Sequence, residues 1–300
     1  MFKITDIFEK IQGIEIVNLT SELVSKVLQI DDKSFDKNSI AWCSDKNIEL
    51  LNNIQEGTVI ISQKAFSEKH FIINENVCIL VVENARKSFS VMLNSFFVEK
   101  DIFGQMGDNV HIHSSVNVDF DSVIFGNNVT IEKDCEIGKN VIIDHNSVIK
   151  SGTIISANIK IGSNCTIGGV GFGYERNESG QYEVIPHIGN VILKNNVEIG
   201  NNVCIDRAVL GSTILHEHVK VDNLVHIAHG VEIGKNSLII ANAMIAGSVK
   251  IGENCWIAPS ASIKQKLTIG DDSIVGLGSV VLRNVDEKST VAGVPAKKLN

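Results

Sequence analysis

The 300-residue sequence has little of the residues that mark several common protein classes. It contains three prolines and 5% aromatic residues, and its 16 leucines are outnumbered by 43 isoleucines and 33 valines. Few prolines argue against a proline-rich disordered protein. A helical bundle would be rich in leucine rather than in β-branched residues. We therefore expect a chain that is mostly β-strand.

The sequence also lacks a surplus of positive charge. Lys and Arg number 27 against 35 Asp and Glu, which gives a formal net charge of -8. This balance argues against a nucleic-acid or membrane-surface binder, since such proteins carry a basic face. No window approaches 18 uninterrupted apolar residues, and the first residues show no basic segment followed by an apolar run. We expect a soluble cytoplasmic protein without stable membrane insertion and without a nucleic-acid partner.

The six cysteines occur singly, with no CxxC pair and no matching histidine spacing. This scatter favours reduced, mostly buried thiols over disulfides or zinc ligands. They are Cys43, Cys78, Cys135, Cys165, Cys204 and Cys255.

A repeat of six residues dominates the sequence from Phe125 onwards. An aliphatic or aromatic residue returns at every sixth position as far as Ile167. The same spacing then holds for thirteen consecutive aliphatic residues from Val209 to Val281. Six is a multiple of the strand period of two, so these side chains all point to one side. Short strands joined by corners at fixed length make a parallel β-solenoid, in which three hexads close one triangular coil.

The repeat is interrupted by a long insertion, residues 168–187. It contains both tyrosines, Tyr174 and Tyr182, and begins with a glycine-rich run around Phe172. The glycines are compatible with a dinucleotide fingerprint, but no helical pattern follows them. A solenoid can expel an insertion sideways, and expelled loops with aromatic tips are usually functional. We favour a loop folded over a cleft between subunits, with Phe172 and Tyr174 contacting substrate.

The domain organisation follows from where the repeat is present. Residues 1–100 lack it and predict a small α/β domain, residues 101–285 form the solenoid, and residues 286–300 form a C-terminal tail. Within the first domain we expect helices over residues 4–11, 21–30 and 85–97 and strands over residues 57–61 and 77–82.

Candidate chemistry lies in the segment 221–230. The hexad register places Asp222, Asn223 and His229 near corners and outer faces of a coil. A neutral imidazole that projects into a groove between subunits can accept a proton near pH 7. His226 and His229 are equally compatible with solvated or structural roles, and the pattern alone leaves both interpretations open.

Gly247 follows His229 by three hexads, which make one full coil, and should lie directly over it. A position without a side chain lets a substrate approach the backbone, where a main-chain N–H can meet the oxyanion formed when a thioester carbonyl is attacked. The alternative is that the glycine only relieves a crowded corner.

Four segments resemble the UDP-3-O-acylglucosamine N-acyltransferases of lipid A biosynthesis. They are residues 168–173, 185–189, 205–207 and 222–229, the last of which reads Asp-Asn-Leu-Val-His-Ile-Ala-His. The resemblance covers the first domain and the solenoid. It implies a left-handed parallel β-helix of hexapeptide repeats and lipopolysaccharide synthesis as the process served. We also expect a homotrimer, because a solenoid with an exposed flat face and an outward catalytic histidine needs a neighbour to close the cleft.

The resemblance also implies roles for single residues. His229 corresponds to the general base, Asn223 to a sugar contact beside Asp222, and Gly247 to the oxyanion site. The first domain of the family sandwiches uracil, and the matching positions here are Trp42 and Ile48, so the second stacking face is missing. Lys266 stands where the family has a second histidine.

The end of the sequence is similar to another group. Its Ala-Gly-Val-Pro-Ala-Lys run, residues 292–297, resembles a segment of coenzyme A-dependent sugar acetyltransferases. We therefore expect an N-acyltransferase that uses an acyl carrier protein thioester and a UDP-amino sugar, with an acetyl-CoA-dependent acetyltransferase of surface polysaccharide synthesis as the alternative. Acyl-ACP or acyl-CoA is then a co-substrate, and neither a tightly bound cofactor nor a metal is expected.

Two further classes share parts of this pattern. A zinc hydratase of the γ-carbonic anhydrase kind would need histidines from adjacent coils, but the positions one and two coils before His229 are Gly211 and Leu193. A non-catalytic sugar-binding scaffold is the other alternative.

Overall fold

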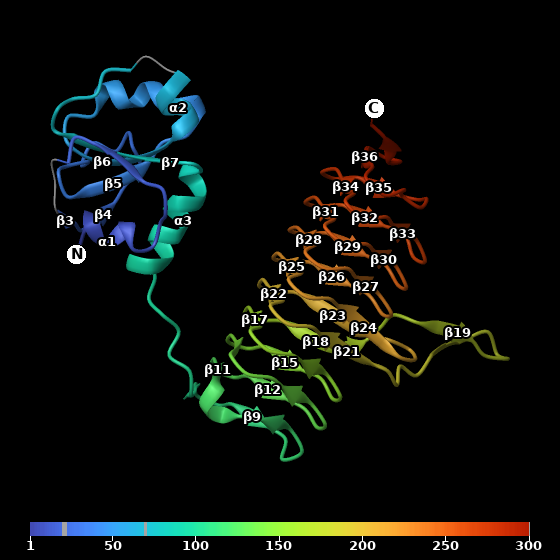
Figure 1. Ribbon diagram of the computed structural model, residues 1–300. Helices are drawn as coiled ribbons and strands as arrows, with labels where there is room; N and C mark the ends of the chain where they lie inside the picture. The colour runs from blue at the N-terminus through green and yellow to red at the C-terminus, as the bar shows by residue number, and fades with distance from the viewer. Residues whose placement is uncertain (20–22, 69–70, 300) are drawn as a thin grey trace. The chain divides into compact units, whose positions relative to one another are not determined.

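The computed structural model describes residues 1–19, 23–68 and 71–299. The chain divides into two compact units, Met1–Asp101 and Ile102–Asn300 (Figure 1). No helix within the described ranges is long and apolar enough to cross a membrane.

The first unit is built on a five-stranded sheet of order β2-β7-β6-β5-β4. β6 and β7 are buried at every position, because apolar residues from both faces of the sheet form separate clusters. The sheet strands are β2 (Glu15–Val17), β4 (Lys26–Val27), β5 (Ser39–Trp42), β6 (Gly57–Ser62) and β7 (Val77–Val82). The remaining elements are β1 (Phe2–Lys3), β3 (Leu23–Val24), α1 (Ile4–Phe8), η1 (Asp45–Asn53), α2 (Gln63–Glu68) and α3 (Ala85–Phe96).

Most of the elements predicted for this unit are confirmed, but the helix expected over residues 21–30 is wrong. Its described part forms β3 and β4 instead, while residues 21 and 22 lie outside the described residues. β3 pairs with β1, and Val27 of β4 pairs with Ile40 of β5. Pairing with a buried strand outweighs an amphipathic spacing in so short a segment.

The second unit is a parallel solenoid with three sheets as its faces. The eight-stranded sheet contains β10 (Asn117–Val118), β13 (Glu136–Ile137), β16 (Ile154–Ile155), β21 (Asn190–Leu193), β24 (Ser212–Leu215), β27 (Glu232–Ile233), β30 (Lys250–Ile251) and β33 (Thr268–Ile269). The nine-stranded sheet contains β9 (His111–Ile112), β12 (Thr130–Ile131), β15 (Val148–Ile149), β18 (Thr166–Val170), β23 (Cys204–Arg207), β26 (His226–Ile227), β29 (Met244–Ile245), β32 (Ser262–Ile263) and β35 (Val280–Val281).

The eleven-stranded sheet closes the triangle. It contains β8 (Gln105–Met106), β11 (Val123–Phe125), β14 (Val141–Ile143), β17 (Lys160–Ile161), β22 (Glu198–Ile199), β25 (Lys220–Val221), β28 (Leu238–Ile239), β31 (Trp256–Ile257), β34 (Ile274–Val275), β36 (Thr290–Ala292) and β37 (Lys297–Lys298). A short 3-10 helix, η2 (Phe120–Ser122), precedes β11.

The hexad explains both the core and the corners of the solenoid. The aliphatic residues that return at every sixth position stack in columns. Ile227, Ile245 and Ile263, for example, pair across three coils and are 0% exposed. Asparagine recurs at corners where the backbone is left-handed, with φ 59 at Asn128, because it tolerates this conformation better than most residues. Asn128 also donates to Asn146 of the next coil at 2.9 Å, so the corners form polar ladders.

The long insertion leaves the stack without disturbing it. In a regular coil each residue pairs with the one three hexads further on, as Ile137 does with Ile155. Ile155 pairs instead with Leu193, so the chain between these two is longer than one coil and the surplus is expelled. The surplus forms the hairpin of β19 (Tyr174–Arg176) and β20 (Tyr182–Val184), which projects sideways from the coils (Figure 1). Leu193 then pairs with Leu215, again beyond three hexads, which reveals a second and shorter insertion.

The last residues are not the separate tail that we expected for 286–300. β36 pairs in parallel with β34, and β37 returns antiparallel to β36, so residues up to 298 extend the eleven-stranded sheet. Val291 is 7% exposed and closes this end of the core. As predicted for the thiols, five of the six cysteines are buried, and Cys204 is exposed.

Candidate active site

A cleft of about 430 Å³ lies beside His229, at the corner between β26 and β27. Its walls come from four successive coils and from the insertion. The lining residues are Phe172, Asp206, His226, Ala228, His229, Met244, Ala246, Gly247, Ser248, Gln265 and Lys266.

The imidazole of His229 packs between two glycines. A Cβ atom added to Gly247 would lie 2.7 Å from His229 Nε2, and one added to Gly171 would lie 2.9 Å from His229 Cβ. Both distances are too short for a side chain. Gly247 therefore faces the nitrogen edge of the ring from the next coil, while Gly171 covers the ring from the insertion.

The backbone of Gly247 has an available donor. Its carbonyl accepts from Lys266 N at 2.9 Å, but its N–H donates to no acceptor among the described residues. At the equivalent position of the next corner, Glu253 N–H donates to Asp271 Oδ1 at 2.8 Å. The residue one coil beyond Gly247 is Gln265, which provides no such acceptor, so the N–H is left for another ligand.

The pKa of His229 is lowered, first because the ring is partly buried and then because His187 adds a nearby positive charge. The two rings meet edge to face, with centroids 5.3 Å apart. His187 is 7% exposed and its Nδ1 lies 2.6 Å from the Ile185 carbonyl oxygen. A histidine in this setting is neutral at pH 7 and has a lone pair to accept a proton.

Asp206 and His226 form a second pair in the cleft wall. Asp206 Oδ2 lies 3.6 Å from His226 Nε2, and the Asp206 side chain is 13% exposed. Burial raises the pKa of Asp206, while the charges of His226 and His187 act in the opposite direction. Neither Asp206 nor His187 was among the predicted site residues, although both lie in the segments that carried the resemblance.

Phe172 and Lys266 line the same cleft, whereas Tyr174 does not. The Phe172 ring is 88% exposed and lies 4.9 Å from the Tyr174 ring, so Tyr174 supports Phe172 rather than the cleft itself. Lys266 lies on the corner one coil beyond Gly247. The structure thus brings four of the predicted residues together, namely His229, Gly247, Phe172 and Lys266.

Asp222 and Asn223 lie elsewhere, at the corner between β25 and β26, and neither lines the His229 cleft. Asp222 Oδ1 accepts from Asn223 N–H at 2.7 Å, and Asn223 Oδ1 accepts from the backbone N–H of Asn201 at 2.7 Å. A triangular coil directs its corners to different sides. The exposed Asn223 therefore cannot share one ligand-sized cleft with His229 of the same coil.

Trp42 lies in the first unit, at the end of β5, and lines a cleft of about 510 Å³. Phe89 of α3 lies on the same cleft, with its ring centroid 6.3 Å from that of Trp42. Ile48, which occupies the second stacking position in the sequence, is 1% exposed and belongs to the core. It offers no face to a ligand, so Trp42 and Phe89 are the aromatic surfaces of this cleft.

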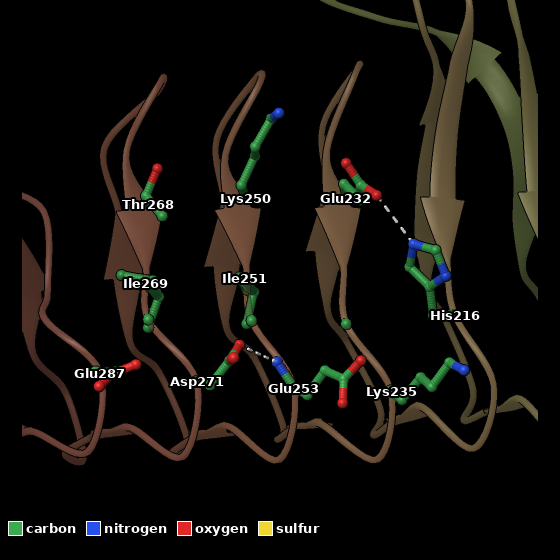
Figure 2. Close-up of a pocket in the computed structure, with 13 residues that line it drawn as sticks. His216, Glu232, Lys235, Lys250, Ile251, Glu253, Thr268, Ile269, Asp271 and Glu287 are labelled. Carbon is green, nitrogen blue, oxygen red and sulfur yellow. Dashed lines mark hydrogen bonds and ion pairs between the residues drawn. The ribbon is translucent and has the colours of Figure 1, made fainter.

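A further cleft of about 660 Å³ lies on the eight-stranded sheet, over β27, β30 and β33 (Figure 2). Its walls mix both signs of charge, and the His216 and Glu232 side chains point toward each other at 3.0 Å. None of the predicted site residues lines it.

Comparison with known proteins identifies the family. Residues 248–283 match the family described as Bacterial transferase hexapeptide (six repeats). UDP-3-O-acylglucosamine N-acyltransferase 1 of Legionella pneumophila (strain Paris) is 37% identical over 254 residues, which cover 79% of this chain and 69% of that protein. This chain belongs to the UDP-3-O-acylglucosamine N-acyltransferase family.

Other relatives match shorter portions. The enzyme of the same name from Cytophaga hutchinsonii is 54% identical over 84 residues, which cover 28% of this chain and 24% of that protein. UDP-3-O-acylglucosamine N-acyltransferase 1 of Francisella tularensis subsp. holarctica is 34% identical over 219 residues, covering 67% and 62%. The matches thus span less than two thirds of these two relatives.

Solved structures support the fold. LpxA from Acinetobacter baumannii gives a TM-score of 0.59 at 22% identity and covers 66% of this chain and 74% of its own. The UDP-N-acetylglucosamine acyltransferase of Francisella novicida gives 0.58 at 21% identity, with coverage of 64% and 68%. The left-handed parallel β-helix predicted from the resemblance is confirmed, and so is the resemblance itself.

Proposed function

We propose that this protein is an N-acyltransferase of lipid A biosynthesis. It moves an acyl group from the pantetheine thioester of acyl carrier protein to the amine of a UDP-amino sugar. Membership of a family with this name supports the reaction class. The observation that carries the proposal is the neutral imidazole of His229 held against Gly247, a residue without a side chain and with an available N–H.

In the proposed reaction the amine nitrogen attacks the thioester carbonyl while His229 takes a proton from that nitrogen. A carbon–nitrogen bond forms, the carbonyl oxygen becomes negative, and the Gly247 N–H donates to it. The carbon–sulfur bond then breaks, and His229 returns the proton to the departing thiolate. Starting from the neutral amine, no proton is lost or gained over the cycle, so the base is regenerated.

The functional unit that we propose is a homotrimer. Asn223 and Asp222 can serve the same substrate as His229 only if they come from a neighbouring copy, because within one chain they occupy another corner. Two exposed apolar side chains support contact at both places, namely Leu224, 59% exposed beside Asn223, and Phe172, 88% exposed beside His229. Threefold closure would bring unlike corners together and complete the cleft.

For the nucleotide we propose the cleft of the first unit. The Trp42 and Phe89 rings give it two aromatic surfaces, and base–aromatic stacking needs one flat face at least. The core position of Ile48 supports Phe89, rather than Ile48, as the second aromatic contact. A cytoplasmic location remains part of this proposal.

The donor distinguishes this proposal from its alternative, an acetyl-CoA-dependent acetyltransferase of surface polysaccharide synthesis. Thiol release should be measured with hydroxyacyl carrier protein and with acetyl-CoA, against a panel of UDP- and dTDP-amino sugars. The proposal expects the carrier protein to support the faster reaction with a UDP sugar. Rates with acetyl-CoA above those with every long acyl donor would refute the lipid A assignment and support the alternative.

A further inference from the structure

The carboxylate of Asp206 in the wall of the His229 cleft accepts no hydrogen bond from the described residues. It comes from β23, lines the cleft, and its side chain is 13% exposed. Among the described residues no N–H or O–H donates to it, and its nearest charged partner is His226 Nε2 at 3.6 Å, beyond hydrogen-bond distance. Carboxylates that are mostly buried normally accept several hydrogen bonds.

The groups around Asp206 do not neutralise it. The Arg207 guanidinium is directed elsewhere, since Nε donates to the Gly168 carbonyl at 2.7 Å and Nη2 to the Ser151 carbonyl at 2.9 Å. His187 and His226 act on Asp206 only through their charge. The pKa of the Cys204 thiol is raised first by burial and then by the negative charge of Asp206. The Asp206 carboxylate therefore lines the cleft without a hydrogen-bond donor from the described residues, and a cationic ligand that enters the cleft can pair with it.

The acceptor in the proposed reaction carries such a group. An amino sugar has a primary amine, which at neutral or lower pH is largely an ammonium with three N–H donors. The same cleft holds Asp206, the imidazole of His229 and the backbone of Gly247. An amine held by Asp206 would lie within reach of the base that must take its proton.

We propose, on the basis of the function proposed above, that Asp206 binds the ammonium group of the acceptor and selects amines over hydroxyls. The bound ammonium loses one proton to solvent through the open cleft. The second proton leaves as the carbon–nitrogen bond forms and goes to His229. A hydroxyl acceptor brings no positive charge, so it would leave the carboxylate unpaired.

Asp206→Asn tests this assignment, because the amide has nearly the same shape but no charge. We expect the KM for the UDP-amino sugar to rise roughly 10- to 100-fold, the range for a hydrogen bond to a charged group. The increase should shrink as the pH rises through the pKa of the amine, since the neutral amine needs no anion. The KM for the acyl donor should stay unchanged.

Glu232→Gln is the matched control. It breaks another histidine–carboxylate pair, with His216 at 3.0 Å, in the cleft on the eight-stranded sheet. That variant should leave the acceptor KM within about threefold of wild type. A fall in kcat for Asp206→Asn that is independent of pH, with an unchanged acceptor KM, would mean that Asp206 is only structural and would overturn the inference.

A second measurement needs neither a variant nor a donor. Calorimetry on the wild-type protein should compare the UDP-amino sugar with its analogue that carries a hydroxyl in place of the amine. We expect the amine to bind at least about tenfold more tightly below its pKa and this advantage to vanish above it. Equal affinities would overturn the role of Asp206. If no donor supports transfer but the preference for the amine persists, the proposed function fails and the assignment of Asp206 stands.

Discussion

Gly247→Ala changes the candidate site by a single methyl group. The added Cβ would lie 2.7 Å from His229 Nε2 and 2.8 Å from Cε1. Ordinary contact needs about 3.5 Å, so the imidazole must move by about 0.8 Å. Displacing a positioned group by about 1 Å can cost roughly 100-fold in rate, and we expect kcat to fall by a factor of this order.

The loss should be specific to the chemical step. Alanine fits the backbone at this position, because Gly247 is not in the left-handed region, and overpacking should cost about 1–3 kcal/mol of stability. Gly276→Ala is the matched control, since its Cβ would lie 2.9 Å from the Ala292 Cβ, a comparable close contact at a position that does not line the cleft. Thiol release and thermal unfolding should be measured for both variants. If Gly247→Ala retains kcat within about threefold of wild type, the close contact between Gly247 and the base is irrelevant to the reaction.

Three other predictions rest on separate parts of the structure. Burial and the charge of His187 hold the pKa of His229 down, so kcat should rise with pH through that lowered pKa. His187→Gln should move this rise to higher pH. An unchanged pH profile would exclude an effect of His187 on the pKa of His229. Trp42→Ala should weaken nucleotide-sugar binding by about 1–3 kcal/mol in calorimetry, with little change in kcat, and equal affinity would place the nucleobase elsewhere. Ile263→Ala should lower the free energy of unfolding by about 2–5 kcal/mol, against about 1 kcal/mol or less for the exposed Ile274→Ala; similar losses for both would contradict the hexad core.

The repeat could be predicted from the sequence because it is a local pattern with one physical cause. Every sixth residue must point inward, and every corner needs a residue that accepts a left-handed backbone. The neighbourhood of His229 and Gly247 follows from counting three hexads along the chain, and the structure places the two residues in contact. Counting works here because no insertion lies between them.

Counting fails where the chain leaves the stack. His187 lies at the end of the long insertion, and the second insertion separates it from His229, yet their rings are 5.3 Å apart. How the insertion returns depends on side-chain packing, such as that of Gly171 on both histidines, which no periodicity encodes. The helix predicted over residues 21–30 is wrong for a related reason, because β3 and β4 in this segment are decided by pairing with β1 and β5.

The central claim is that His229 is the base that accepts the proton of the attacking amine. Its most direct test is the turnover of His229→Ala with the acyl donor and acceptor that support the wild-type reaction. We expect kcat to fall by roughly two to four orders of magnitude, the usual contribution of a positioned base, while the melting temperature and the affinity for the nucleotide sugar change little. A variant that keeps substantial turnover would contradict the account and remove His229 from the mechanism.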